Sequence, residues 1–179
     1  MSSLLRLTAL IRAEGGMLAT LVREDAAIAA SRKNGHGPAQ VAAAGPRAAG
    51  RRDEYELFVE AIYEGYLLHY GKARVMDSSE HDVRLLAGDR LYALGLSRLV
   101  ALGDVPAVGE LADLITISAR AQEADDPELA GAAWMAGARA IGWGESTVYS
   151  RAKELAFAGD PEALEALRVS AQPPAGART

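Results

Sequence analysis

The chain has 179 residues and a net charge of −5, from 19 basic and 24 acidic side chains. A net acidic chain argues against nucleic-acid binding, which needs a basic surface against the phosphates. Cysteine is absent, which excludes disulfides, thiolate nucleophiles and cysteine-ligated zinc sites.

The first predicted element is an N-terminal helix within residues 1–30. Its apolar residues recur at spacings of three, four and seven, which is the pattern of one helical face: Leu4, Leu7, Ile11, Leu18 and Val22. Adjacent glycines at Gly15 and Gly16 interrupt the pattern, so we expect a bend or a break there. Arg6 and Arg12 interrupt the apolar stretch that a signal peptide would need.

Residues 31–51 are rich in glycine, proline and small side chains and show no period. This composition predicts a flexible linker. We interpret its basic residues as solvated charges, although they could contact an acidic partner: Arg32, Lys33, Arg47, Arg51 and the adjoining Arg52. A helical core domain is expected over residues 52–170, followed by a disordered tail at 171–179.

The core domain reads as a series of helices joined by short stop-and-cap signals. The expected helices cover residues 53–69, about 79–102, 105–123, about 127–141, about 145–158 and about 161–170. The joints are Gly103-Asp104, Asp126-Pro127 and Gly159-Asp160-Pro161, which place a capping aspartate or a proline at a helix start. Short joints favour antiparallel neighbours. Because no segment alternates with period two, we predict an all-α, compact antiparallel helical bundle without a sheet.

The helix ending near Leu102 is apolar nearly all the way round, which is typical of a central helix. We therefore expect its leucines to be buried: Leu86, Leu91, Leu94 and Leu99. Charges within this segment oppose a membrane span, namely Arg84, Asp89, Arg90 and Arg98. No other segment is a better candidate for a transmembrane helix, so we expect a cytoplasmic location.

Side chains that could carry chemistry do not form a recognisable site. No nucleophile elbow, P-loop, dinucleotide fingerprint or zinc-protease motif occurs. The acidic residues around His81 open a helix, where carboxylates gather because of the helix dipole. Glu56, Glu60 and Glu64 share one helical face but lack a Glu-x-x-His partner, and we interpret them as a solvated face. His69 is interpreted as a helix-ending or packed residue. We expect no catalytic, cofactor-binding or metal-binding residues.

One stretch carries a family resemblance. Residues 65–122 contain the run Leu86, Ala87, Gly88 and Asp89 inside a long aliphatic helix, preceded by the sequence His-Tyr-Gly at 69–71. This arrangement resembles the trans-isoprenyl (polyprenyl) diphosphate synthase family. The resemblance implies an all-helical core like that of a truncated isoprenyl synthase.

The chain departs from this family where the family's chemistry resides. Those enzymes bind Mg²⁺ through two aspartate-rich motifs, and neither motif is present here; the Arg-Arg-Gly that follows the first is also missing. The resemblance therefore implies a small, non-catalytic subunit of a heteromeric long-chain prenyl diphosphate synthase. Such a subunit helps shape the product-length tunnel, and Mg²⁺ is bound only through the catalytic partner.

Two other hypotheses stay open: an unrelated helical protein-interaction or scaffold domain, and a small-ligand or enzyme domain of another kind. In the preferred hypothesis the chain pairs with a catalytic prenyl diphosphate synthase subunit, or with itself as a homodimer. Candidate interface contacts are Tyr92, Leu96, Leu99 and Leu111.

Overall fold

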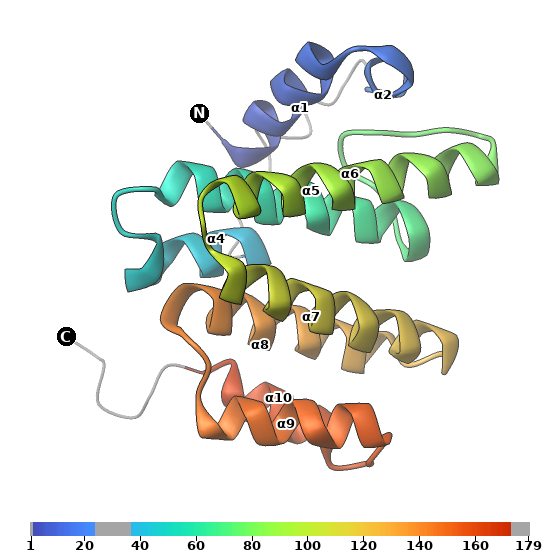
Figure 1. Cartoon of the computed structure of the whole chain (residues 1–179). Coiled ribbons are helices and arrows are strands. Elements are labelled where there is room, and N and C mark those ends of the chain that lie inside the picture. Colours follow the sequence, from blue (N-terminus) through green and yellow to red (C-terminus); the bar gives the residue numbers. More distant parts are fainter. Residues whose placement is uncertain (1, 24–36, 173–179) are drawn as a thin grey trace.

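The computed structural model describes residues 2–23 and 37–172. In chain order the elements are α1 (Ser3–Glu14), α2 (Gly16–Thr20), α4 (Pro38–Ala44), the 3₁₀ turn η1 (Pro46–Ala48), α5 (Arg52–Tyr70), α6 (His81–Ala101), α7 (Val105–Glu123), α8 (Pro127–Trp143), α9 (Thr147–Ala158) and α10 (Ala163–Ser170). Figure 1 shows antiparallel pairs stacked in layers, α5 with α6, α7 with α8, and α9 with α10. The predicted all-α class is confirmed for these residues, and none of these helices is long and apolar enough to cross a membrane.

The joints between the core helices follow the capping residues that the sequence predicts. The side chain of Asp104 accepts a hydrogen bond from the backbone N–H of Ala107, and that of Asp126 accepts one from the N–H of Leu129. Each satisfies a donor that the first turn of a helix leaves unpaired. Gly159 ends α9 in the left-handed conformation at φ 69°, which glycine adopts without strain.

The N-terminal segment breaks where its two glycines stand. Gly15 and Gly16 have φ of 71° and 59°, so α1 and α2 are separate helices. The apolar face of α1 packs on α5, where Leu7 and Ile11 are fully buried. An isolated bridge between Val22 and Met76 fastens the end of this segment to the loop after α5. Residues 24–30 of the predicted N-terminal helix lie outside the described residues.

The prediction of a flexible linker over 31–51 is wrong for its described part. Residues 38–48 form α4 and η1, whose inward side chains are buried alanines: Ala39, Ala42, Ala43 and Ala48. A Cβ added to Gly45 would lie 2.1 Å from the carbonyl oxygen of Gly142, so α4 ends directly against the backbone of α8. Small side chains permit this approach and also hide any hydrophobic period. Residues 31–36 and 173–179 lie outside the described ranges.

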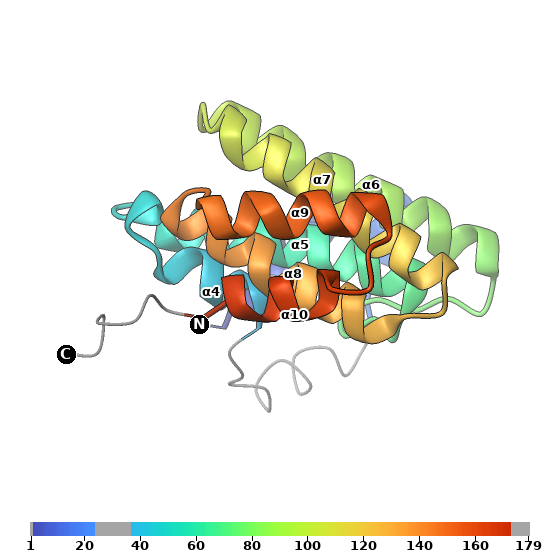
Figure 2. The same ribbon diagram turned by 90° about the horizontal axis from the view of Figure 1, so that it is seen from below.

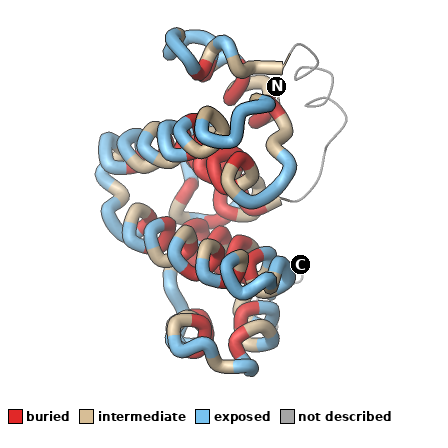
Figure 3. Tube along the Cα trace, turned by 90° about the vertical axis from the view of Figure 1, so that its right-hand side faces the viewer, coloured by how far each residue is buried: buried red, intermediate tan, exposed pale blue. Residues whose placement is uncertain are grey.

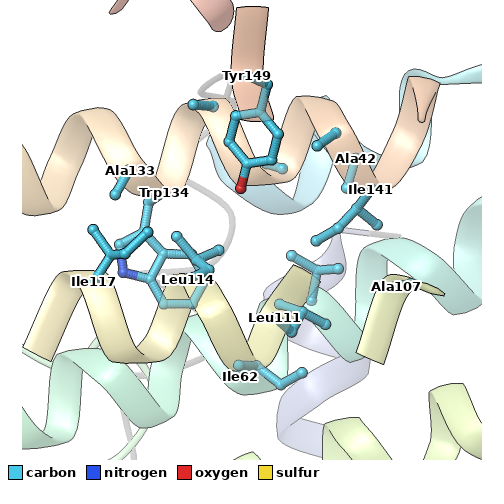
Figure 4. Close-up of a cluster of buried hydrophobic side chains, with 14 of the residues drawn as sticks. Ala42, Ile62, Ala107, Leu111, Leu114, Ile117, Ala133, Trp134, Ile141 and Tyr149 are labelled. Atoms are coloured by element: carbon cyan, nitrogen blue, oxygen red, sulfur yellow. The ribbon is translucent and has the colours of Figure 1, made fainter. Parts of the chain in front are cut away.

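The main apolar core lies between α4, α5, α7, α8, α9 and α10, and α6 adds Leu99. Trp134 on α8 is 1% exposed and is surrounded by side chains of neighbouring helices, among them Leu114 and Ile117 of α7 (Figure 4). Figure 3 shows that buried residues gather on the faces that the layers turn toward one another. The layers thus share one core, to which α1 and α2 add a second apolar cluster on α5 and α6.

The prediction that the helix ending near Leu102 is central is wrong. Five of the 21 residues of α6 are buried, against ten of the 19 in α5. Leu91 and Leu99 are buried as predicted, but Leu86 is 57% exposed and Leu94 is half-buried. α6 contacts α5 strongly and α7 less, and its outer face has no neighbour within the described chain.

Candidate protein-binding surface

The residues of the Leu-Ala-Gly-Asp run divide between the inside and the outside of the bundle. Ala87 and Gly88 are buried where α6 crosses α5. A Cβ on Gly88 would lie 2.4 Å from the ring of His69 and 3.0 Å from the carbonyl oxygen of Gly65. Gly88 is therefore needed for the close approach of the two helices, which is a structural role.

The other two residues of the run face outward. Leu86 is 57% exposed. The side chain of Asp89 is 67% exposed, and its Oδ1 lies 3.1 Å from Nε2 of His69. The His69 ring in turn stacks on Tyr92 at a centroid distance of 5.4 Å. Nε2 of His69 is itself buried and makes no hydrogen bond, and the run contributes no set of converging ligands.

Exposed apolar residues recur along the outer face of α6. Leu86 and Val100 are 57% and 56% exposed, and the exposed Ala93 lies between them at a spacing of seven residues from each. Leu96 borders this row and packs partly against the main core. We call these four residues the α6 outer stripe. An exposed apolar row on a helix with charged neighbours is typical of a surface that binds another protein.

Only part of the predicted interface lies at this surface. Tyr92 and Leu96 are half-buried on α6 and therefore accessible at its edge. Leu99 and Leu111 are 0% exposed within the main core, so their prediction as interface contacts is wrong. Both leucines lie on the core side, where α6 and α7 contact each other, and the sequence alone does not reveal on which side of α6 the next helix lies.

The interpretation of Glu60 and Glu64 as a solvated face is also wrong. Glu64 is 0% exposed. Its Oε1 accepts the backbone N–H groups of Arg74 and Val75 at 2.6 and 2.7 Å, and its Oε2 accepts Nε of Arg74 at 3.0 Å. The carboxylate therefore holds the loop after α5 against the helix.

Glu60, one turn earlier, joins three further segments. Its Oε1 pairs with Nη2 of Arg74 at 2.6 Å, and its Oε2 accepts the Ser3 hydroxyl at 2.8 Å and the Gln40 amide at 3.2 Å. Burial lowers the pKa of Arg74, but the charges of Glu60 and Glu64 outweigh it and raise that pKa. Both carboxylates are fully occupied by protein groups, which leaves no free oxygen for a metal ion.

One more polar cluster ties two helices together. The ammonium of Lys153 on α9 lies 3.0 Å from carboxylates of both Glu110 and Asp113 on α7. Tyr149 beside it has a pKa raised by burial and by Glu110, so its phenol stays protonated and cannot act as a base. Within the described ranges, no group of three or more His, Cys, Asp or Glu residues could hold a metal ion.

The hollows of the surface are open. One has a volume of about 620 Å³ and lies between the end of α5 and α7, lined by Tyr70, Ile115, Thr116, Ala119, Arg120, Gln122 and Glu123. Another, of about 510 Å³, adjoins Glu60 and Arg74. Neither brings together a nucleophile, a base and an oxyanion donor.

The chain was compared with protein-family models, curated proteins and solved structures, and none of them matches it.

Proposed function

We propose that this chain is a non-catalytic accessory subunit that binds a catalytic isoprenyl diphosphate synthase chain through the α6 outer stripe. The observation that carries the proposal is the exposure of Leu86 and Val100 on the helix that bears the Leu-Ala-Gly-Asp run. In this proposal the inner half of the run builds the α5–α6 crossing and the outer face of α6 meets the partner.

The state of the carboxylates supports a non-catalytic role. Ionising an allylic diphosphate requires Mg²⁺ held by several free carboxylate oxygens. Glu60 and Glu64 are buried and bonded to Arg74, and Glu56 pairs with Arg6 at 2.6 Å. The catalytic partner would supply the Mg²⁺ ligands, and this chain would help shape the tunnel that sets product length.

A second candidate is an unrelated helical interaction domain, and the same stripe favours it. An apolar row on one helix serves any partner with a complementary groove, including a second copy of this chain. The two candidates differ in the partner that they require, so they are separated by binding to a defined synthase and by its product.

The test is co-expression with a full-length synthase of the same host that carries both aspartate-rich motifs. Sedimentation should show a heteromeric complex. Leu86→Glu and Val100→Glu should each dissociate it, because a charge at the centre of an apolar contact stays unpaired. Val169→Glu is the matched control, since Val169 is 47% exposed on α10, away from the stripe.

Product analysis completes the test. With Mg²⁺, isopentenyl diphosphate and an allylic diphosphate, the chain alone should yield no product, and the complex should yield products of a different length from those of the synthase alone. Product from the isolated chain that disappears in Asp89→Ala would refute the non-catalytic role. A stable homodimer that does not bind the synthase, and that dissociates in the Leu86→Glu variant, would favour the unrelated interaction domain.

A further inference from the structure

A second exposed surface lies at one end of the bundle. The starts of α5, α7 and α9 and the end of α8 lie at the left of Figures 1 and 2. Arg51 donates to the carbonyl oxygen of Leu102 at 3.0 Å, and Arg47 pairs with Asp104 at 2.6 Å, which joins η1 and the start of α5 to the α6–α7 joint. This end is therefore one continuous region of the surface.

The corner between α8 and α9 at this end combines apolar exposure with an arginine. Trp143, the last residue of α8, is 38% exposed, and Val148 in the first turn of α9 is 52% exposed. The guanidinium of Arg139 lies over the Trp143 ring at 4.5 Å. We call Arg139, Trp143 and Val148 the α8–α9 corner.

Half-buried cations elsewhere in the described chain have polar partners. Arg6, Arg47, Arg74 and Lys153 pair with carboxylates, and Arg84 donates to the carbonyl oxygens of Leu68 and Gly71. Within the described residues Arg139 has the ring contact but no carboxylate within ion-pairing distance. Its pKa is lowered because burial removes water from the guanidinium. A partly desolvated charge of this kind gains most from an external carboxylate.

The acidic side chains near the corner already have partners and are not available to Arg139. Asp104 is already held by Arg47 and by the hydroxyl of Tyr55. Glu145, next to the corner in sequence, pairs with Lys153 at 3.2 Å. Tryptophan and arginine are also the residues that most often anchor protein interfaces.

We infer that the α8–α9 corner binds an acidic segment of a protein partner. Apolar side chains of that segment cover Trp143 and Val148, and one of its carboxylates reaches Arg139. The corner is separate from the α6 outer stripe, so this inference does not rest on the proposed function.

The test uses the full chain and a short amphipathic peptide of leucine and glutamate. A peptide with lysine in place of glutamate is the charge control. The two tryptophan indole N–H signals in NMR report the site, because Trp143 is exposed and Trp134 is 1% exposed. The acidic peptide should shift the Trp143 signal and leave that of Trp134 in place.

Variants assign the contact to the corner. Arg139→Gln should weaken binding of the acidic peptide about tenfold, the loss expected of an interface anchor, and Trp143→Ala should weaken it similarly by calorimetry. Arg12→Gln, which changes an exposed arginine on α1, should change nothing. Free glutamate at millimolar concentration should not compete, because it lacks the apolar contact.

Three outcomes would overturn the inference. They are absence of binding by the acidic peptide, equal binding of the lysine peptide, and unchanged affinity in an Arg139→Gln protein whose melting temperature matches that of the parent. Competition by free glutamate would instead assign the corner to small carboxylates and remove the protein partner. None of these outcomes depends on a synthase, so they leave the proposed function untouched.

Discussion

α5 and α6 are antiparallel neighbours of similar length, yet they occupy opposite places in the fold. α5 carries Glu56, Glu60 and Glu64 on one face and still buries ten of its 19 residues. α6 has a similar proportion of apolar residues and buries five of 21. The difference shows that two helices of similar apolar content can be buried to different extents, depending on which neighbours surround them.

The neighbours of α5 explain its central position. α1, α4, α6 and the loop after α5 all contact it, and its charged face is covered because Arg74 and Gln40 supply partners for the carboxylates. The outer face of α6 receives no such cover within the described chain. A buried charge is tolerated where it is paired, and an apolar row stays exposed where no element reaches it.

The strongest way to break this comparison is to remove a carboxylate from α5. Glu64→Ala would leave Nε of Arg74 and two backbone N–H groups without their acceptor in the interior. We expect a loss of about 3–5 kcal/mol, typical of breaking a buried ion pair from one side. Glu54→Ala on the exposed face of the same helix is the control and should change stability by less than about 0.5 kcal/mol.

Urea unfolding monitored by circular dichroism measures both variants. Equal stability of Glu64→Ala and the parent would mean that the carboxylate is not the support of the loop after α5. In that case α5 would be central for its apolar contacts alone, and the comparison with α6 would lose its electrostatic part.

The sequence predicts the class and the helix ends well because these depend on local signals. Asp104 and Asp126 cap their helices as expected, and α7 spans Val105–Glu123, the range that its pattern predicts. α4 escapes prediction because its buried face consists of alanines such as Ala39 and Ala42. The burial of Glu60 escapes because its partners, Ser3, Gln40 and Arg74, come from three other segments.

Leucine truncations on α6 sharpen the comparison, because this helix has one buried and one exposed face. Leu91 is 0% exposed and Leu86 is 57% exposed. Leu91→Ala should cost about 2–5 kcal/mol through lost burial and a cavity, whereas Leu86→Ala should stay within about 0.5 kcal/mol. The melting temperatures of the two variants, measured by thermal unfolding, test this difference. Similar melting temperatures would show that Leu86 is buried in solution, as in a homodimer.

Glycine substitutions examine how closely α5 and α6 approach each other. A Cβ on Gly95 would lie 2.4 Å from Cγ1 of Ile62 and 2.8 Å from the carbonyl oxygen of Phe58. Gly95→Ala should therefore cost about 1–3 kcal/mol by overpacking. At Gly109 on α7, nothing lies within 4 Å of the added carbon, so Gly109→Ala should gain up to about 1 kcal/mol of helix propensity. Denaturant titrations measure both changes in stability. If Gly95→Ala and Gly109→Ala changed the free energy of unfolding in the same direction, the close approach of α5 and α6 at Gly95 would be contradicted.

The smallest expected effect concerns the start of α5, where Tyr55 donates its hydroxyl hydrogen to Asp104 of the α6–α7 joint. Burial, followed by the bond to Asp104 and the charge of Asp104, raises the pKa of Tyr55 from 10.0 to about 12. Tyr55→Phe should cost about 1 kcal/mol at neutral pH, the net worth of one hydrogen bond.

Because the folded chain holds this proton more tightly than the unfolded chain, the contribution of Tyr55 to stability is complete below pH 10. It is lost as the pH rises through about 12. Denaturant midpoints measured from pH 9 to pH 12 should therefore fall less steeply for Tyr55→Phe than for the parent. Parallel slopes would show that the phenol titrates alike in both states, and that Tyr55 does not anchor α5 to the joint through its proton.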